Sequence, residues 1–351
     1  MTVTIRDVAR QAGTSTATVS HVLNDTGRIT RETRQRVLEA VKHLKYHPNL
    51  HARNLAAGRS RIWGMVVSDI ENPFFPELIR AFEKRARQRG YEVIVSDTNY
   101  DPRLMKRAAV RMLEQKVGGV AIMTSEMSPR LIEEIVGRHI AVSLFDRGLT
   151  GPYMCDIKMD YGSGIRQAIE HLYGLGHRQI AFVAGRSSLK NVKARQVAYT
   201  QLMQAHGLEA GPVLAGNQRF EGGFAAGKLL VGLSPRPTAV IAMNDLTAVG
   251  VIKALHQHGL GVPGDVSVVG FDNTQLARQF IPRLTTLDMH TEVLGRLAAD
   301  SLYELTSAPE RGGKEYTMAV ELVVGESTGP APRLTSLADL KDMTPAPQPL
   351  P

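Results

Sequence analysis

The sequence has little of what builds disulfides, cysteine-based metal sites or membrane spans. Cys155 is the only cysteine among 351 residues, which excludes an internal disulfide and a cysteine-based zinc site. No run of about 20 apolar residues occurs, and the N-terminus is too polar and too soon helical for a secretory signal. The chain is therefore expected to remain in the cytoplasm. Its 43% hydrophobic and 22% charged residues are typical of a globular protein longer than one domain.

Motifs of catalysis and metal binding are also missing. Gly259, Gly261 and Gly264 spell GxGxxG, but they follow an expected helix and precede an expected strand, the reverse of the order in dinucleotide-binding folds. His256 and His258 are two residues apart, which places them on different faces of a helix. No GxSxG elbow or comparable nucleophile with a base occurs. The sequence therefore predicts neither an enzyme nor a metal site.

Positive charge is concentrated at the N-terminal end. Residues 1–61 hold 11 Lys or Arg and 4 Asp or Glu, so 11 − 4 = +7 of the formal charge of +8 lies there. The rest of the chain is nearly neutral. A solvated basic face is the usual explanation of a charge run. A distribution as uneven as this one is, however, what the neutralisation of nucleic-acid phosphates requires.

The segment TIRDVARQAGTSTATVSHVLN, residues 4–24, predicts two short helices joined by a tight turn. Thr4 is an N-cap residue ahead of apolar positions that recur at spacings of three and four. Gly13 can take the left-handed conformation that ends the first helix, and Ser15 can cap the second. Val19 and Leu23 of the second helix are expected to face inward.

The opposite face of the second helix carries short side chains and no acidic residue. Its members are Thr16, Ala17, Ser20, His21 and Asn24. Such a face suits base edges and phosphates in a major groove. An ordinary helical hairpin has the same spacing and is the alternative.

A third helix is expected from about Arg31 to Lys45, capped by Thr30. Its apolar stripe would close a small three-helix core and consists of Val37, Ala40, Val41 and Leu44. The helix stops at Tyr46-His47-Pro48, because proline disfavours the helical conformation in the residue before it.

From Arg61 onward, apolar strand-like runs alternate with amphipathic helices. The runs are IWGMVVS, YEVIVS, VGGVAIM and IAVSLF, followed later by QIAFVAG, TAVIAMN and VSVVGF. This alternation predicts two successive parallel sheets, each covered by helices. Ligands of such sheets bind beyond the carboxyl ends of the strands, so two facing lobes would form a cleft there.

Aromatic rings, carboxylates and amides gather at the ends of these strands. The candidates are Ser68, Asp69, Asn72, Phe74, Phe75, Asp146, Arg147, Asn244, Asp245, Asp272 and Asn273, with Arg195 on the helix after QIAFVAG. A ring packs on the C–H faces of a sugar and a carboxylate accepts hydroxyl protons, so the set suits a polyhydroxylated ligand. A single Asp or Asn at a strand end is more often a helix cap, and Asp245 and Asn273 are interpreted as caps.

Together these motifs resemble the lactose-repressor family of bacterial transcription regulators. The resemblance covers about residues 3–328, and its most specific later stretches are ENPFF, MNDLTAVG, VPGDVSVVGFDN and IPRLTTL. It implies a small all-α helix-turn-helix head and an α/β core of two parallel-sheet lobes, like the type I periplasmic binding proteins. The implied segments are the head (1–47), a hinge helix and linker (48–60), the core (61–328) and a disordered tail (329–351). Within the core, the N-lobe would hold about 61–160 and 290–328, and the C-lobe about 161–289.

The resemblance also implies which residues contact DNA. The base-reading positions fall on Thr16, Ala17 and His21, with Thr4, Ser15, Thr18, Ser20 and Asn24 supporting them or touching phosphate. Residues 49–58, NLHARNLAAG, look like the family's hinge helix, which orders when two copies meet over the minor groove. In that motif, Leu55 is the leucine wedged into the central base step, beside Asn49, Ala52 and Arg53. Simple packing is the alternative reading of a lone leucine.

The family's effector-binding positions align with Phe74, Phe75, Asp146, Arg195, Asn244 and Asp272, and we add Ser68, Asn72 and Gln218. Arg195 would hold the ligand from one lobe and Asp272 from the other. Gln218 stands where many members have an aromatic ring, and Phe220 could substitute only if the loop shifts. Nearby Lys190, Lys193 and Arg186 would favour an acidic ligand such as a sugar acid. A carbohydrate or a sugar acid is expected in preference to a purine.

The resemblance implies a repressor that binds a pseudo-palindromic double-stranded operator as a homodimer and needs a small-molecule effector but no cofactor. Whether the effector releases or promotes DNA binding stays open. Leu334, Leu337 and Leu340 give barely two turns before a proline-rich end, too few for a tetramerising coiled coil. One alternative is a sugar-binding transport component, which would need an export signal and no basic head. Another is a sugar-modifying enzyme with Asp146 and Asp272 as acid and base.

Overall fold

The computed structural model describes residues 3–23, 25–46, 60–186, 189–309 and 312–332. The chain forms two compact units, Met1–Arg61 and Ile62–Pro351. Over the described ranges, no helix is both long enough and apolar enough to cross a membrane.

The first unit consists of three helices, α1 (Ile5–Ala12), α2 (Thr16–Leu23) and α3 (Arg31–His43). Helix α1 begins after Thr4 as predicted, and the Asp7 carboxylate accepts hydrogen bonds from the Thr4 N–H at 2.9 Å and the Thr4 hydroxyl at 2.7 Å. Gly13 has the predicted left-handed conformation, with φ of 61°. The Ser15 hydroxyl oxygen accepts from the Thr18 N–H at 3.1 Å, which caps α2.

The core of this unit is small and is built from one stripe of each helix. Its fully buried centre consists of Val8, Val19 and Val37, while the predicted inward-facing Leu23 is partly buried against it. Helix α3 ends at His43, two residues before the predicted end, and Leu44 is its C-cap. Helices α1 and α3 thus hold α2 in place, and the outer face of α2 is exposed to solvent.

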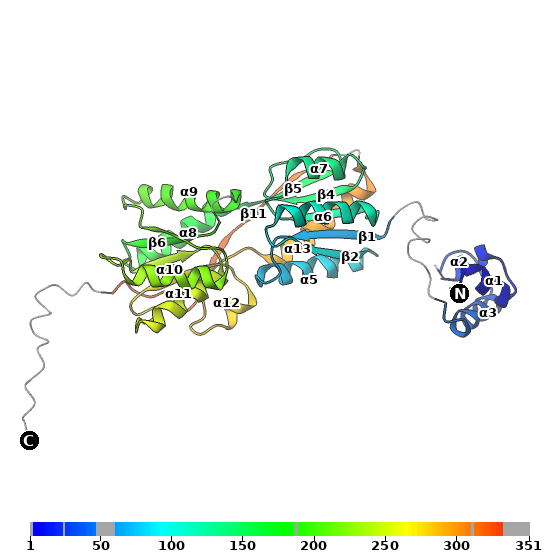
Figure 1. Cartoon of the computed structure of the whole chain (residues 1–351), viewed down its shortest axis with the longest axis horizontal. Helices are drawn as coiled ribbons and strands as arrows, with labels where there is room; N and C mark the ends of the chain where they lie inside the picture. The colour runs from blue at the N-terminus through cyan, green and yellow to red at the C-terminus, as the bar shows by residue number, and fades with distance from the viewer. Residues whose placement is uncertain (1–2, 24, 47–59, 187–188, 310–311, 333–351) are drawn as a thin grey trace, which may run out of the picture. The chain divides into compact units, whose positions relative to one another are not determined.

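The second unit contains two six-stranded sheets, each forming a lobe (Figure 1). In the N-lobe the strand order is β11-β5-β4-β3-β1-β2, and in the C-lobe it is β12-β10-β9-β8-β6-β7. Neighbouring strands are parallel except β10 and β12, which are antiparallel. The predicted pair of parallel sheets is confirmed.

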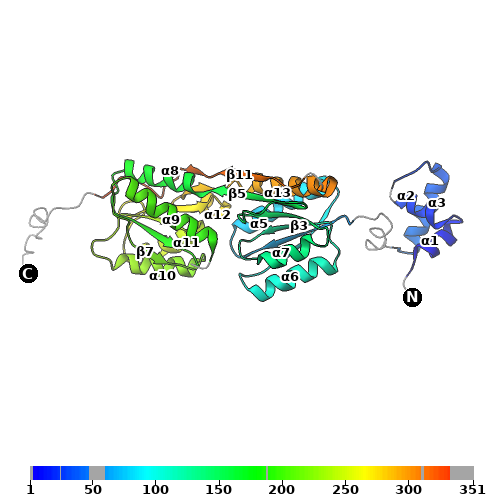
Figure 2. The same ribbon diagram turned by 90° about the horizontal axis from the view of Figure 1, so that it is seen from above.

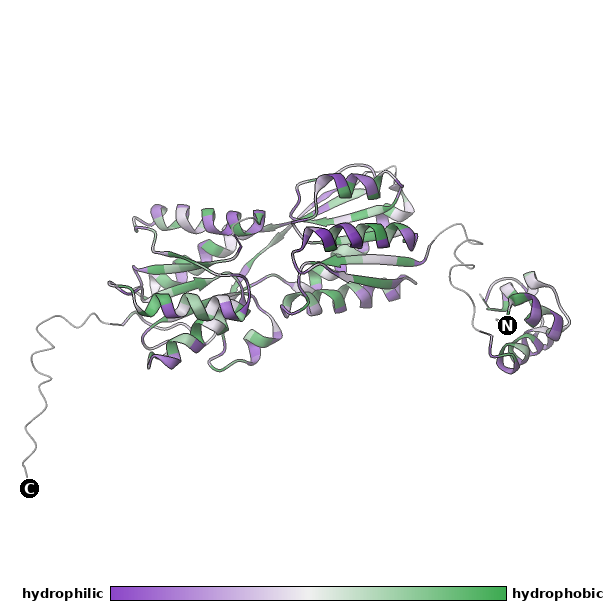
Figure 3. Ribbon diagram, in the orientation of Figure 1, coloured by the Kyte–Doolittle hydropathy of each residue, from purple (hydrophilic) through white to green (hydrophobic). Residues whose placement is uncertain are grey.

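The N-lobe strands are β1 (Ile62–Val67), β2 (Glu92–Asp97), β3 (Gly119–Met123), β4 (Ala141–Phe145), β5 (Met154–Asp160) and β11 (Glu315–Ala319). Its helices are α5 (Phe74–Gln88), α6 (Pro102–Glu114), α7 (Pro129–Val136) and α13 (Thr291–Ser307). Helices α5 and α13 pack together on one face of the sheet, and α6 and α7 cover the other. The apolar strands lie between helices that are polar outside, as Figure 3 shows by hydropathy.

The C-lobe strands are β6 (Ile180–Ala184), β7 (Val213–Ala215), β8 (Ala239–Ala242), β9 (Ser267–Asp272), β10 (Thr285–Asp288) and β12 (Glu321–Val323). Its helices are α8 (Tyr161–Gly174), α9 (Lys190–Ala205), α10 (Phe220–Val231), α11 (Asp245–Gln257) and α12 (Gln275–Gln279). Helices α8 and α9 cover one face, and α10 and α11 the other.

The chain passes between the lobes three times, after β5, after β10 and after β11. Figure 2 shows α8, β5, β11 and α13 along the same side of the unit. The predicted assignment of residues 290–328 to the N-lobe is wrong beyond β11. Strand β12 pairs antiparallel with β10, with Leu322 opposite Leu287, so the chain returns to the C-lobe after Ala319.

The start of the predicted disordered tail is also wrong. Gly329 donates its N–H to the Ser267 hydroxyl at 3.0 Å, and Ala331 donates to the Leu175 carbonyl at 2.8 Å. Residues 329–332 therefore lie along the C-lobe, because its loops offer partners for their backbone. The leucines proposed for a short terminal helix lie outside the described residues.

Replacing Gly250 by alanine should destabilise the C-lobe. Helices α10 and α11 meet so closely that a Cβ on Gly250 would lie 2.2 Å from the Phe220 carbonyl oxygen. Overpacking of this kind typically costs about 1–3 kcal/mol, so the Tm should fall in a thermal unfolding experiment. Gly174→Ala is the matched control at another helical glycine, where a Cβ meets nothing within 4 Å. An unchanged Tm for Gly250→Ala would contradict the close approach.

Candidate functional site

A pocket lies at the carboxyl ends of the strands and is lined by both lobes. Its N-lobe wall consists of Ser68, Asn72, Phe74, Phe75, Tyr100, Met123, Thr124, Ser125, Glu126 and Phe145. Its C-lobe wall consists of Asn191, Arg195, Gln218, Met243, Asn244 and Asp272, with Met289 on the connection after β10. The predicted cleft between two sheets is therefore present.

Eight of the nine predicted effector-binding residues line this pocket, namely Ser68, Asn72, Phe74, Phe75, Arg195, Gln218, Asn244 and Asp272. Asp146 is the exception, because its carboxylate turns to other partners. It accepts from the Met159 N–H at 2.9 Å and from the Tyr161 hydroxyl. Burial raises the pKa of Asp146 to about 6. Asp146 and Asp272, the acid and base considered for a sugar-modifying enzyme, thus do not both line this pocket.

Arg195 is a buried cation of the C-lobe wall. Its guanidinium carbon lies 3.8 Å from the centre of the Phe271 ring and 4.4 Å from that of Tyr161. One Nη donates to the Met243 carbonyl at 2.8 Å. Rings on two sides and a carbonyl at one nitrogen hold the guanidinium in place, so its position is fixed before any ligand arrives.

Two buried polar atoms of the wall lack a hydrogen-bond partner among the described residues. They are Nε of Arg195 and Oε1 of Gln218, whose side chains belong to residues only 6% and 8% exposed. A buried donor or acceptor without a partner costs about 1–3 kcal/mol. A ligand with both donors and acceptors would remove that cost.

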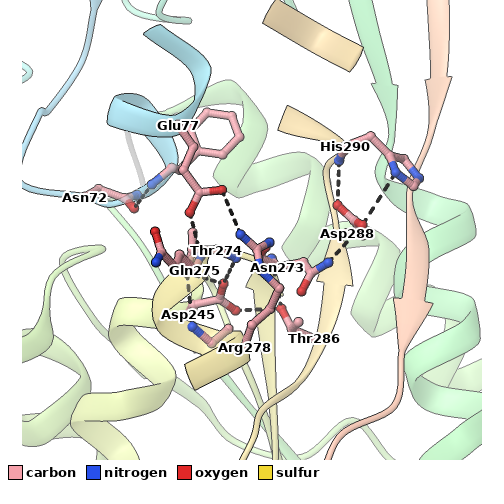
Figure 4. Close-up of polar contacts among 12 residues, drawn as sticks. Asn72, Glu77, Asp245, Asn273, Thr274, Gln275, Arg278, Thr286, Asp288 and His290 are labelled. Carbon is pink, nitrogen blue, oxygen red and sulfur yellow. Dashed lines mark hydrogen bonds and ion pairs between the residues drawn. The ribbon is translucent and has the colours of Figure 1, made fainter. Parts of the chain in front are cut away.

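The predictions that Asp245 and Asn273 cap helices are both wrong. Helix α11 is capped by Asn244, whose side chain accepts from the Thr247 N–H at 2.8 Å. Asp245 instead accepts three hydrogen bonds across the lobe, from the N–H and hydroxyl of Thr274 and from the hydroxyl of Thr286 (Figure 4). The longer-range partners displace the local ones, because Asp245 is buried beside the loop after β9.

Asn273 likewise donates to Asp288 at 2.9 Å, and Thr274 caps α12. Asp272, just before this loop, has a φ of 111°, in the region that disfavours side chains. Burial and the nearby Asp245 carboxylate raise the pKa of Asp272 well above its ordinary value, and Arg195 opposes the shift. Asp272 is thus a strained, buried acid on the pocket wall, a combination found at ligand-binding sites.

Several pocket residues were missed, among them Tyr100, Glu126 and Asn191. Tyr100 and Glu126 each follow a strand end by three residues, so the strand-end rule would have found them had it been applied to β2 and β3. The three cations thought to favour an acidic ligand lie elsewhere. Lys190, Lys193 and Arg186 are exposed and do not line the pocket, and Phe220 does not line it either.

The lobes contact each other on both sides of the pocket. Arg219 of the C-lobe forms ion pairs with Asp69 at 3.0 Å and Glu71 at 3.1 Å of the N-lobe. In Figure 4, Glu77 of α5 accepts from the N–H of Gln275 and from Arg278, the latter at 3.3 Å. The free volume left among the lining side chains is about 50 Å³. That holds a few waters at about 10–15 Å³ each.

In the first unit, the predicted DNA-contacting residues from Ser15 to His21 lie on or beside the outer face of α2. Ser15, Thr16, Ala17 and His21 are exposed, and Thr18 and Ser20 are partly buried. The hydroxyl of Thr4, itself exposed, donates to Asp7. The remaining predicted residues, Asn24, Asn49, Ala52, Arg53 and Leu55, lie outside the described residues. The helix-turn-helix geometry itself is confirmed.

Buried acids, among them Asp146 and Asp245, should make the stability of the protein depend on pH. Burial raises the pKa of Asp146 to about 6 and that of Asp245 to about 7, against 3.8 for an ordinary aspartate. The folded state therefore binds protons that the unfolded state does not, and the contribution to stability is full below 3.8 and lost as pH rises through 6 to 7. His177 opposes this trend, because burial lowers its pKa.

A comparison with one variant isolates this effect. The Tm of Asp146→Asn, measured from about pH 5 to about pH 8, should change less with pH than that of the wild type. Parallel profiles for the two proteins would show that Asp146 does not titrate in this range.

A helix-turn-helix unit followed by two parallel-sheet lobes around a pocket is the architecture of a DNA-binding transcription regulator. Residues 4–49 match the family model described as bacterial regulatory proteins, lacI family, and residues 169–328 match the periplasmic binding protein-like domain. The chain belongs to the lactose-repressor (LacI) family.

Similar proteins agree with this membership over nearly the full length. The HTH-type transcriptional regulator DegA of Bacillus subtilis (strain 168) is 34% identical over 336 residues, which cover 94% of this chain and 99% of the relative. The HTH-type transcriptional repressor PurR of Mannheimia succiniciproducens is 33% identical over 329 residues, covering 92% and 98%. A crystal structure of the Lac repressor dimer bound to operator and the anti-inducer ONPF has a TM-score of 0.82 and 28% identity, covering 94% of this chain and 100% of that one.

Proposed function

We propose that the protein is a homodimeric repressor whose affinity for a pseudo-palindromic operator changes when a carbohydrate binds between its lobes. The observation that carries the effector half of this proposal is the pair of buried, unpartnered atoms on the pocket wall, Nε of Arg195 and Oε1 of Gln218. The Lac repressor dimer, bound to operator and to a small molecule, is the related precedent. Such a regulator works at DNA in the cytoplasm.

For DNA, the proposal assigns base reading to the exposed face of α2. This face presents the methyl groups of Thr16 and Ala17, the Thr16 hydroxyl and the His21 ring, and it carries no carboxylate. The excess of basic residues in the same unit supplies phosphate contacts. The hinge assignment of Asn49, Ala52, Arg53 and Leu55 rests on the sequence motif alone and is part of the same proposal.

For the effector, the pocket offers what a sugar needs. Phe74 and Phe75 lie edge to face, 5.1 Å apart, and give an apolar wall for ring C–H groups. Arg195, Gln218 and Asp272 offer donors and acceptors to hydroxyls, which both donate and accept. A sugar carries hydroxyls around its whole ring and can reach polar groups on both lobes at once, so we favour the carbohydrate.

Effector binding would act through the angle between the lobes. The pocket is built from both lobes, and cross-lobe ion pairs such as Arg219 with Asp69 hold them closed. A ligand with unequal affinity for the open and closed arrangements shifts their populations, and by linkage the affinity for operator. Either sign of response is compatible with this coupling.

Selection of bound sequences from random duplex DNA by the full-length protein tests the proposal. The selection is run alone and with pooled neutral sugars, amino sugars, sugar acids or purines. We expect one palindrome to be enriched and one sugar pool to change its recovery, in a direction that gives the sign of the response. The double variant Thr16→Ala/His21→Ala should lose the enrichment. Failure to enrich any sequence in every pool would refute the DNA half, and a response to purines alone would refute the effector half.

A further inference from the structure

Glu126 is a further charged residue of the pocket wall. It lies in the loop after β3, and its carboxylate accepts hydrogen bonds from the Ser68 hydroxyl at 3.0 Å and the Ser125 hydroxyl at 2.8 Å. The Thr124 hydroxyl donates to the same carboxylate. All four residues line the pocket, so Glu126 organises this part of the N-lobe wall.

The direction of these hydrogen bonds decides what the wall can offer a ligand. An ionised carboxylate only accepts hydrogen bonds, and a hydroxyl has a single proton to donate. Because Ser68, Thr124 and Ser125 give their protons to Glu126, their oxygens present only lone pairs to other partners. This end of the pocket is therefore a cluster of acceptors, which requires a donor from the ligand.

The C-lobe wall has the opposite character. Arg195 carries N–H groups that only donate, and its Nε is without a partner among the described residues. The side-chain oxygen of Asn191 already accepts from the Val192 N–H at 2.9 Å, which leaves its NH₂ group as a donor. A ligand that bridges the two walls is thus oriented, with donors toward Glu126 and acceptors toward Arg195.

The charges of the wall add to this preference. Glu126 and Asp272 are acids, and Arg195 is the base that lines the pocket with them. Two further cations lie outside the lining residues. Arg147 donates to the Ser125 carbonyl behind the loop, and Arg186 lies over the Tyr100 ring at 5.0 Å. The negative charge of the wall is centred on Glu126, because the raised pKa of Asp272 favours the neutral form of that acid. An anionic ligand group at the N-lobe end would lie against this charge and would meet hydroxyls whose protons are already donated.

We infer that Glu126 is a specificity-determining residue, which makes the pocket select a ligand with a hydroxyl or ammonium group at the N-lobe end and reject a carboxylate at that end. The inference rests on the proposed function, since it takes the pocket to be the effector site. It narrows the effector class to ligands that place a donor against Glu126, as neutral sugars and amino sugars do, and disfavours a sugar acid whose carboxylate would lie at that end.

Calorimetric titration of the full-length protein tests this inference with matched probes. Each set contains a neutral hexose, its 2-amino-2-deoxy derivative and its uronic acid, in the gluco, galacto and manno series. In the set that binds, we expect the neutral or amino sugar to bind at least about tenfold more tightly than the uronic acid. The comparison between those two members shows whether the donor is a hydroxyl or an ammonium group.

Glu126→Gln should reduce this discrimination by about tenfold, because an amide both removes the charge and can donate to a carboxylate. Glu126→Asp should retain most of it. Glu134→Gln is the control, because it removes the same charge from an exposed position on α7 and should leave the ratio unchanged. If Glu126→Gln is too unstable to bind operator, Ser68→Ala and Ser125→Ala replace it, and each should weaken binding of the preferred sugar.

The outcomes separate this inference from the proposed function. Tighter binding of a uronic acid by the wild type, or an unchanged ratio in Glu126→Gln, overturns the role of Glu126 but leaves a sugar-responsive regulator. If no set binds while the protein still selects a palindrome, the carbohydrate effector and this inference both fail, and the DNA-binding function stands.

Discussion

Arg195→Ala should abolish the effector response and leave operator affinity in the absence of effector unchanged. The guanidinium is buried, held by Phe271, Tyr161 and the Met243 carbonyl, and it lines the pocket. Truncation removes the donors that the ligand would use and exposes a cavity between two rings. Losses for buried, central arginines reach 2 kcal/mol or more, so we expect effector affinity to fall by at least about thirtyfold.

Calorimetric titration with the effector found by selection measures the effector affinity. Titration of operator DNA measures the operator affinity. Lys193→Ala is the matched control, since Lys193 is exposed on the same helix and does not line the pocket. A variant that keeps its response would show that the effector binds elsewhere. Loss of operator binding in both variants would point to a folding defect in α9 rather than to a ligand contact.

Ile281→Asp should convert the proposed dimer to monomers and weaken operator binding by about a hundredfold or more, since each half-site needs its own head. Ile281 follows α12 in the C-lobe and is 86% exposed, the most exposed of the large apolar residues in the described ranges. A dimer contact that covers Ile281 would remove this side chain from water, and an aspartate buried there in its place would lack a partner.

Sedimentation and operator titration give the two readouts. Val197→Asp, which makes the same change at an exposed position on α9, should remain dimeric and bind operator normally. A dimer that survives Ile281→Asp would place the contact surface on another part of the protein.

The pocket could be predicted from the sequence because one topological rule carries most of it. The carboxyl ends of parallel strands meet at one edge of a sheet, so residues as distant as Phe74 and Asp272 could be assigned to one cleft before any contact was known. Tyr100 and Glu126 were missed only because the rule was not applied to every strand. Asp146 satisfies the same rule, but Tyr161 and Met159 take up its carboxylate. Side-chain direction is a tertiary property that strand order does not encode.

Local rules were less reliable where distant partners compete. Asp245 and Asn273 have the residue type and position of helix caps. In the folded lobe, however, the Asp245 carboxylate accepts from the Thr286 hydroxyl, and the Asn273 amide donates to Asp288. The return of the chain to the C-lobe was missed for a related reason. Strand β12 is only three residues long, and a short apolar run predicts a strand without showing which sheet it joins.

The three crossings between the lobes have a consequence for synthesis on the ribosome. The N-lobe begins at Ile62, but α13 and β11 of the same lobe are translated only after five strands of the C-lobe. The C-lobe is in turn completed by β12, close to the last described residues. Neither lobe is a contiguous segment, so the N-lobe cannot finish folding before most of the C-lobe has been translated. Premature termination near residue 290 would leave the α5 surface that α13 covers exposed, a species expected to aggregate or be degraded.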